Sequence, residues 1–233
     1  MRDLLFDLDG TLLPMVQDEF ANSYFMQLSK KFRGTGVDTD KLLKTIEKGL
    51  MGMVLNNGRN TNEEVFWQIF EREMKMKKVD IIDRFDEFYL NEFNEIITST
   101  SPTGIAKEII DIAKKKGLRL FLATNPLFPR QATLNRIRWA GLNPEDFLDI
   151  TTYENSHFCK PNVKYFQEII RRNDIDLDSA LMIGNDVNED LSISSLGVKT
   201  FLVTDCLENK HELELTSDFQ GTLRDLKTFI IEL

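Results

Sequence analysis

The sequence predicts an α/β fold in which a doubly wound parallel sheet is interrupted, after its first strand, by an all-helical insertion. Short apolar runs alternate with helical patterns from about residue 100 onward, whereas residues 17–97 are helical in pattern throughout. Strands that alternate with helices form parallel sheets covered on both faces. We therefore expect a sheet domain of residues 1–14 and 100–233 and a helical domain of residues 15–99. A chain of 233 residues can fill a core in each.

The first strand of the predicted sheet is the apolar run at residues 4–6, which leads into Asp7, Leu8, Asp9 and Gly10. Side chains alternate along a strand, so Asp7 and Asp9 are expected on one face and Leu8 on the other. Two carboxylates that point the same way repel each other unless a cation lies between them. Hard oxygen ligands of this kind suit magnesium.

The helical domain is predicted from apolar stripes at helical spacing, which indicate four helices. Breaks fall at residues 33–36, 56–60 and 77–78. Thr61 and Glu64 form a capping-box pattern at the start of the third helix. We expect a small helical bundle.

The rest of the sheet domain is predicted element by element. Ser101 and Pro102 suggest the start of a helix that ends at Gly117. Strands are then expected at residues 118–123, 149–152, 180–183 and 200–203, with helices at residues 131–140, 162–172 and 190–195 between them. Trp139 is expected to pack its helix on the sheet. Ligands of such sheets bind at the carboxyl ends of the strands, where Asp7 and Asp9 lie.

Charge and hydropathy exclude some classes of partner. The formal net charge of −9 argues against nucleic acid or an anionic membrane as the main partner, since both need clustered Lys and Arg. No apolar run approaches the ~20 residues that span a bilayer. The first strand begins almost at once, which leaves no room for a leader, so we expect a cytoplasmic protein. Cys159 and Cys206 form no paired motif and are expected as free thiols. Nothing indicates the oligomeric state.

Three further segments of the sheet domain carry polar residues that are candidates for a site. Thr124 and Asn125 come after the strand at residues 118–123, and Lys160 precedes a proline. Residues 184–190, GNDVNED, form an acidic turn after the strand at residues 180–183. Carboxyl ends of parallel strands meet at one edge, so these groups are candidates for a single site.

Together these segments resemble the haloacid dehalogenase (HAD) superfamily, whose members are mostly Mg²⁺-dependent phosphohydrolases. Residues 7–12, DLDGTL, are similar to its first signature; Thr124, Lys160 and residues 184–190 match the other three motifs in order. The position of the helical insertion is similar to that of helical C1-type caps. The resemblance implies a phosphatase that hydrolyses a small phosphorylated metabolite through an aspartyl-phosphate.

The resemblance also implies a role for each matching residue. Asp7 would be the nucleophile, and Asp9 would protonate the leaving alcohol and then activate water. Lys160, Thr124 and Asn125 would hold the phosphoryl group. The expected Mg²⁺ site draws on Asp7 and Asp9 together with residues from the acidic turn: Asn185, Asp186 and Asp190.

The acidic turn departs from the usual family pattern, because Asn185 stands where the first aspartate is common. Either the Asn185 carbonyl oxygen or Asp186 could therefore contact the metal. We favour Asp186, with Asp190 orienting Lys160. A neutral ligand would also weaken metal affinity.

Other functions stay open at this point. A phosphomutase shares all four motifs, and a catalytically silent phosphate- or partner-binding protein would fit Asn185. Dehalogenation is disfavoured, because a halide leaves without the proton that Asp9 would supply. Specificity is expected in the helical insertion, where Arg59 is a candidate for a second anionic group on the substrate.

Overall fold

The computed structural model describes residues 1–233 and contains one six-stranded sheet with the order β3-β2-β1-β4-β5-β6. Every pairing between neighbouring strands is parallel, as predicted. The five predicted strands are present, and a short sixth strand joins the edge after β5. Its sequence, FQG, has no apolar run to predict it. The strands are β1 (Asp3–Phe6), β2 (Arg119–Leu122), β3 (Asp149–Ile150), β4 (Ala180–Gly184), β5 (Lys199–Val203) and β6 (Phe219–Gly221).

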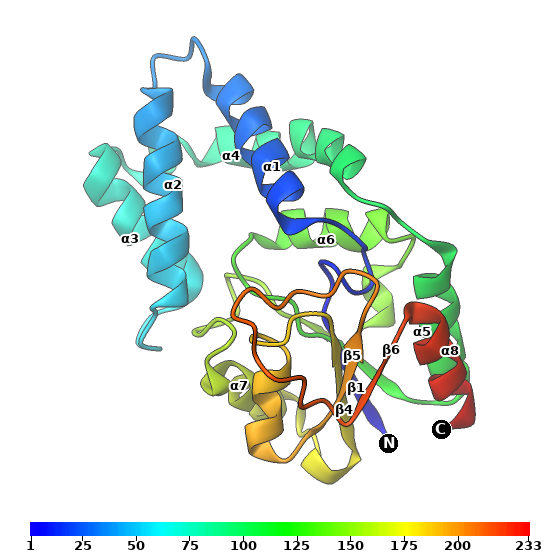
Figure 1. The fold of residues 1–233 in the computed structure, drawn as a ribbon. Helices are drawn as coiled ribbons and strands as arrows, with labels where there is room; N and C mark the ends of the chain where they lie inside the picture. Colours follow the sequence, from blue (N-terminus) through cyan, green and yellow to red (C-terminus); the bar gives the residue numbers. More distant parts are fainter.

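Strand β1 lies at the centre of the sheet and pairs with both β2 and β4. Leu4 and Phe6 enter the larger hydrophobic cluster on one face, whereas Leu5 enters a second cluster on the other face. Helices α5 (Gly104–Lys115) and α8 (Leu223–Glu232) pack together beside the first face, and α7 (Val163–Asn173) covers the second (Figure 1). A strand buried on both faces needs this continuous apolar sequence.

Helix α5 begins later than the sequence predicts. Its N-cap is Thr103, not Ser101, and Pro102 lies outside it. The reason is that this stretch returns from the insertion beside the outgoing chain: the Ser101 N–H donates to the Pro14 carbonyl at 2.7 Å. The two crossings between sheet and insertion therefore run side by side.

The insertion is all-helical and forms a cap above the sheet, toward the upper left of Figure 1. Its helices are α1 (Gln17–Phe32), α2 (Thr39–Val54), α3 (Asn62–Met74) and α4 (Ile82–Leu90), followed by the 3₁₀ segment η2 (Glu92–Ser99). The Thr61 capping box is confirmed at the start of α3. The fourth predicted helix is split, because the chain turns at Asn91. The domain limits near residues 14 and 99 stay a prediction.

Helix α6 (Arg130–Trp139) lies between the cap and the sheet (Figure 1). Trp139 stacks on Phe93 of the cap, with ring centroids 5.1 Å apart and planes at 25°. The expectation that Trp139 packs on the sheet is therefore wrong, because its ring packs on the apolar surface of the cap instead. Cap and sheet residues form one continuous hydrophobic cluster.

The cap touches the sheet domain at a third place, at the start of α3. The Asn62 N–H donates to the Ser156 carbonyl at 2.8 Å, and the Glu63 N–H donates to the Tyr153 carbonyl at 2.9 Å. The buried Asn62 amide also donates to the Pro126 carbonyl and to Cys159 Sγ, each at 3.3 Å. These contacts fasten the loop before α3 to the loops that follow β2 and β3.

Both cysteines are free, as predicted; Cys159 is buried and Cys206 is partly exposed. Burial raises the pKa of Cys159 to about 12. None of the helices is both long enough and apolar enough to span a membrane.

Candidate active site

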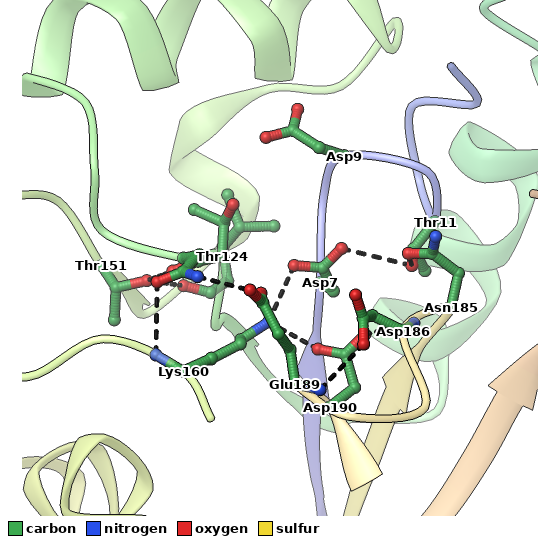
Figure 2. Close-up of polar contacts among 12 residues, drawn as sticks. Asp7, Asp9, Thr11, Thr124, Thr151, Lys160, Asn185, Asp186, Glu189 and Asp190 are labelled. Carbon is green, nitrogen blue, oxygen red and sulfur yellow. Dashed lines mark hydrogen bonds and ion pairs between the residues drawn. The ribbon is translucent and has the colours of Figure 1, made fainter. Parts of the chain in front are cut away.

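Polar side chains from four segments meet at the carboxyl edge of the sheet (Figure 2). Asp7 follows β1, Thr124 follows β2, and residues 185–190 follow β4. Lys160 comes from the loop before α7. Asp7, Thr124 and the residues 185–190 other than Val187 border a cavity of about 390 Å³, and Lys160 lies beneath it, 1% exposed. The structure thus brings together residues that lie up to 183 positions apart, Asp7 and Asp190, as expected for strand ends that meet at one edge of a sheet.

Lys160 is the buried positive charge of the site. Its Nζ donates to Asp7 Oδ1 at 2.8 Å and to Asp190 Oδ1 at 2.6 Å. Burial by itself lowers the pKa of Lys160, but the charges of Asp190 and Asp7 outweigh it and hold the pKa well above its ordinary value. Asp190 therefore orients the lysine, in the position that the sequence suggests.

Asp7 lies near two other carboxylates, those of Asp190 and Asp9. Burial, together with the charges of Asp190 and Asp9, raises the pKa of Asp7 to about 8 against the opposing effect of Lys160. One lysine cannot compensate two buried carboxylates, so the site favours a further cation. The Thr11 hydroxyl also donates to Asp7 Oδ2, at 3.3 Å.

Asp9 borders the same cavity as Asp7, but the two carboxylates have different partners. Strand β1 ends at Phe6, so the strand geometry no longer holds at Asp9. Figure 2 shows the Asp9 carboxylate turned away from Asp7 and Lys160. It accepts a hydrogen bond from the guanidinium of Arg136 on α6 instead. The second carboxylate oxygen, Oδ1, is buried and has no partner.

Arg136 is fixed by its surroundings. Its side chain is 1% exposed, and its guanidinium lies 4.6 Å from the ring of Phe128 and 5.9 Å from that of Phe20 in the cap. It also donates to the Thr133 hydroxyl at 3.3 Å. Arg136 does not border the cavity, so it acts on the site through Asp9.

The Asn185 side chain holds three segments together. Its Oδ1 accepts from the Thr11 hydroxyl at 2.8 Å, and its Nδ2 donates to the Cys206 carbonyl at 2.6 Å. Gly10 turns beside it with φ of +84°, and a Cβ there would collide with the Asn185 amide. The backbone carbonyl of Asn185 accepts from the Glu208 N–H at 3.0 Å. All of these groups are already bonded within the protein.

Asp186 borders the cavity, and the hydrogen bonds that its side chain accepts all go to one of its two carboxylate oxygens. Its Oδ1 accepts from the N–H groups of Asn188 and Glu189 at 2.8 and 2.9 Å. Burial raises the pKa of Asp186, and the charge of Asp190 adds to the effect. A Cβ at Gly184 would overlap the Asp190 carboxylate, so glycine allows the turn to fold back this tightly.

Thr124 and Asn125 form the second side of the polar floor. The buried Thr124 borders the cavity, and its carbonyl is held by the Tyr165 hydroxyl at 2.8 Å. The Asn125 amide donates to Glu189 Oε2 at 2.9 Å and accepts from the Lys160 N–H at 3.3 Å. Burial raises the pKa of Glu189 to about 7.

The donors at this edge suit Mg²⁺ by type. They are carboxylate, hydroxyl and carbonyl oxygens, and negative charge is in excess around Asp7. No three His, Cys, Asp or Glu side chains converge closely enough to hold a metal on their own. Mg²⁺ in phosphoryl-transfer sites takes only one or two carboxylates and completes its shell with water and substrate phosphate. Asp7 and Asp186 fit this requirement, whereas Asp9 is bonded to Arg136.

Arg59 is not brought into the site. It is exposed in the loop that is fastened to the sheet domain, and it does not border the cavity. Two residues that the sequence argument misses, Arg136 and Glu189, lie at the site instead. Glu189 stands in the acidic turn and could have been suspected there. Arg136 is one of three arginines in α6, and no local pattern distinguishes it.

A family model described as "haloacid dehalogenase-like hydrolase" matches residues 2–194. No curated protein matches the chain by sequence.

Solved structures of several activities share the fold. A HAD phosphatase from Thermococcus onnurineus is 18% identical with a TM-score of 0.60, over 99% of this chain and 98% of that one. The magnesium-bound HAD-hydrolase YfnB from Bacillus subtilis is 21% identical with a TM-score of 0.59, over 100% and 99%. An L-2-haloacid dehalogenase from Xanthobacter autotrophicus is 12% identical with a TM-score of 0.57, over 99% and 98%. These likenesses establish the fold of the core and the helical cap.

Proposed function

The chain belongs to the haloacid dehalogenase-like hydrolases, and on that premise we propose that it is a Mg²⁺-dependent phosphatase acting on a small phosphorylated metabolite through an aspartyl-phosphate. The observation that carries the proposal is the Asp7 carboxylate, which borders the cavity while Lys160 holds it from below at 2.8 Å. A nucleophile fixed by a buried cation, next to hydroxyl and amide groups, is suited to phosphoryl transfer.

In this proposal Asp7 attacks phosphorus, the bond from phosphorus to the leaving alcohol breaks, and water later cleaves the aspartyl-phosphate. Lys160 places positive charge beside the transferred group, and Thr124 supplies a hydroxyl at the cavity wall. Bound Mg²⁺ would neutralise the phosphoryl oxygens and the carboxylates around them. Asp7 and Asp186 are the residues that would hold it.

Asp9 is the proposed proton donor and acceptor, and its ion pair with Arg136 constrains that role. In the structure its Oδ2 is bonded to Arg136 and its Oδ1 is buried. To meet a leaving-group oxygen, Asp9 has to turn from Arg136 toward Asp7. That turn requires the carboxylate to exchange one hydrogen-bond partner for another.

The experiment is phosphate release from 4-nitrophenyl phosphate and a panel of phosphorylated metabolites, with Mg²⁺ and with a chelator. We expect release that needs Mg²⁺ and that falls at least about 10³-fold in Asp7→Asn, because the nucleophile is lost. The matched control is Asp178→Asn, an exposed aspartate remote from the cavity, which should keep the activity of the native chain.

Three other results would each overturn the proposal. Activity that depends on a bisphosphate activator and transfers phosphate within a sugar would identify a mutase. Chloride release from 2-chloropropionate without phosphate release would identify a dehalogenase. Binding of Mg²⁺ and a phosphate mimic with no turnover would identify a silent binding protein.

A further inference from the structure

The cavity has two unlike walls. The sheet edge forms a polar floor that carries the carboxylates, Thr124 and Asn125. The cap and the loop after β2 form the opposite wall. Its one polar cap residue, Gln17, already donates to the Asp9 carbonyl, and the rest of this wall is apolar: Phe20, Ala21, Tyr24, Phe25, Leu127 and Phe128. A substrate that places its phosphoryl group on the floor must therefore place the rest of the molecule against this wall.

The apolar wall is built from aromatic rings that hold one another in place. Phe128 meets Tyr24 edge to face, with centroids 5.3 Å apart at 85°, and meets Phe20 at 6.0 Å and 76°. The Tyr24 hydroxyl points away to the Tyr89 hydroxyl, 3.0 Å distant, so Tyr24 offers its ring and not its polar end. Phe25 lies 5.3 Å from Tyr24 and is only partly buried. Such a surface favours an aromatic ring over a polyhydroxylated body.

The charge around the cavity also limits the substrate. Carboxylates line the floor and rim, including Asp186, Glu189 and Glu208. The one lysine that borders the cavity, Lys210, is already paired: its Nζ lies 3.3 Å from Asp18 and 4.0 Å from Glu208. His211 lies on the exposed rim, and Arg59 is outside. A second anionic group on the substrate would meet repulsion and find no free cation.

Resting on the proposed phosphatase activity, we propose that the substrate is a phosphate monoester with an uncharged aromatic body and no second anionic group. Its phosphoryl group lies at Asp7 and Lys160, and its ring lies against Tyr24 and Phe25. Sugar phosphates and bisphosphates are then poor substrates, the first because the wall is mostly apolar and the second because of charge.

The test compares esters that share a primary-alcohol leaving group, so that the chemical step is held nearly constant. Benzyl phosphate carries the ring, cyclohexylmethyl phosphate has its size without aromaticity, 4-carboxybenzyl phosphate adds an anion, and glycerol phosphate is polar. We expect kcat/KM for benzyl phosphate to exceed that for glycerol phosphate and for 4-carboxybenzyl phosphate by about 100-fold each, with cyclohexylmethyl phosphate between them.

A pair of variants on α1 locates the ring. Phe25→Ala should raise KM for benzyl phosphate by about 10-fold, because it removes part of the wall, and should leave KM for glycerol phosphate unchanged. Met26→Ala is the control: this neighbour is 50% exposed and does not border the cavity, so both substrates should behave as with the native chain.

The outcomes separate this inference from the activity on which it rests. Equal kcat/KM for benzyl, 4-carboxybenzyl and glycerol phosphates, all abolished by Asp7→Asn, would overturn the substrate class and keep the phosphatase. An unchanged KM for benzyl phosphate in a folded Phe25→Ala variant would also overturn the class. No release from any ester, 4-nitrophenyl phosphate included, would overturn both.

Discussion

Strand β1 has an aspartate at each end, and the two are treated in opposite ways. Asp3, at the amino end, accepts from Arg119 Nε at 2.7 Å, from Arg119 Nη2 at 2.8 Å and from Arg2 at 3.2 Å. Asp7, at the carboxyl end, shares Lys160 with Asp190. Burial raises the pKa of Asp3, but the arginines outweigh it and hold the pKa below its ordinary value. At Asp7 burial and neighbouring carboxylates prevail, and the pKa rises to about 8.

The difference separates an aspartate that stabilises the fold from one that serves a site. At the amino edge the charges are matched, so Asp3 and Arg119 lock β1 to β2. At the carboxyl edge negative charge exceeds positive charge, and the fold tolerates the excess for the sake of a ligand that supplies a cation. The same residue type therefore has opposite effects on stability at opposite edges of one sheet.

Among variants that test the contrast between the two edges, Lys160→Met is expected to change stability most. It leaves Asp7 and Asp190 buried without their cation, so the free energy of unfolding should fall by about 3 to 5 kcal/mol and turnover should be lost. Urea unfolding of the chelated protein measures the first. Lys164→Met, at a nearby exposed lysine, is the control and should change stability little. A Lys160→Met protein as stable as the native chain would mean that the carboxylates are not charged together.

A somewhat smaller effect is expected from Arg136→Met, which breaks the second buried pair of the site. We expect a loss of about 3 kcal/mol, because the Asp9 carboxylate loses its partner. In Asp9→Asn with Arg136→Met the loss should be smaller than the sum of the single losses, since the pair then disappears as a unit. Kinetically, kcat should fall while KM holds, because Arg136 does not border the cavity. Additive losses in the double-mutant cycle would show that the two side chains are not coupled.

The smallest effect, about 2 kcal/mol, is expected from Asp3→Asn, and its pH dependence tests the comparison directly. The folded pKa of Asp3 is lowered, so its stabilisation is complete at neutral pH and is lost as the pH falls below about 4. The folded pKa of Asp7 is raised, so the native chain should lose stability relative to Asp7→Asn as the pH rises from about 4 toward 8.

Unfolding of both variants and the native chain across this range, with chelator present, measures the two slopes. If the stability differences between the native chain and each of the two variants changed in the same direction with pH, the contrast between the two edges would be contradicted.

Much of the fold follows from local patterns. Strands β1, β2, β4 and β5 are buried on both faces. Such strands need apolar residues at nearly every position, and these continuous apolar runs can be recognised in the sequence. Lys160 and Asp190 could be placed together from the sequence. Asp190 lies in the turn after β4, Lys160 lies in the loop before α7, and both segments meet at the carboxyl edge of the sheet. Strand β6 could not be predicted, because three residues at an edge need no apolar face.

The parts that escaped prediction depend on contacts between distant segments. The Asp9 carboxylate is bonded to Arg136, which α6 brings to it from 127 positions away. Arg59 stays outside the cavity, in a loop whose position is set by the bonds of Asn62 to Ser156 and Pro126. Trp139 faces the cap because Phe93 stacks on it. None of these partners can be inferred from spacing along the chain.

The attachment at Asn62 and the shared hydrophobic cluster bear on how modular the molecule is. An insertion joined only by its two chain crossings could be exchanged between relatives or deleted as a unit. Here, removing residues 15–99 would expose Trp139, which the cap now covers, and would leave the Ser156 and Tyr153 carbonyls without their donors. The sheet has thus become dependent on this particular cap. A chimera that carries a foreign insertion would need a matching asparagine at its docking loop and an apolar surface for α6 before it could fold.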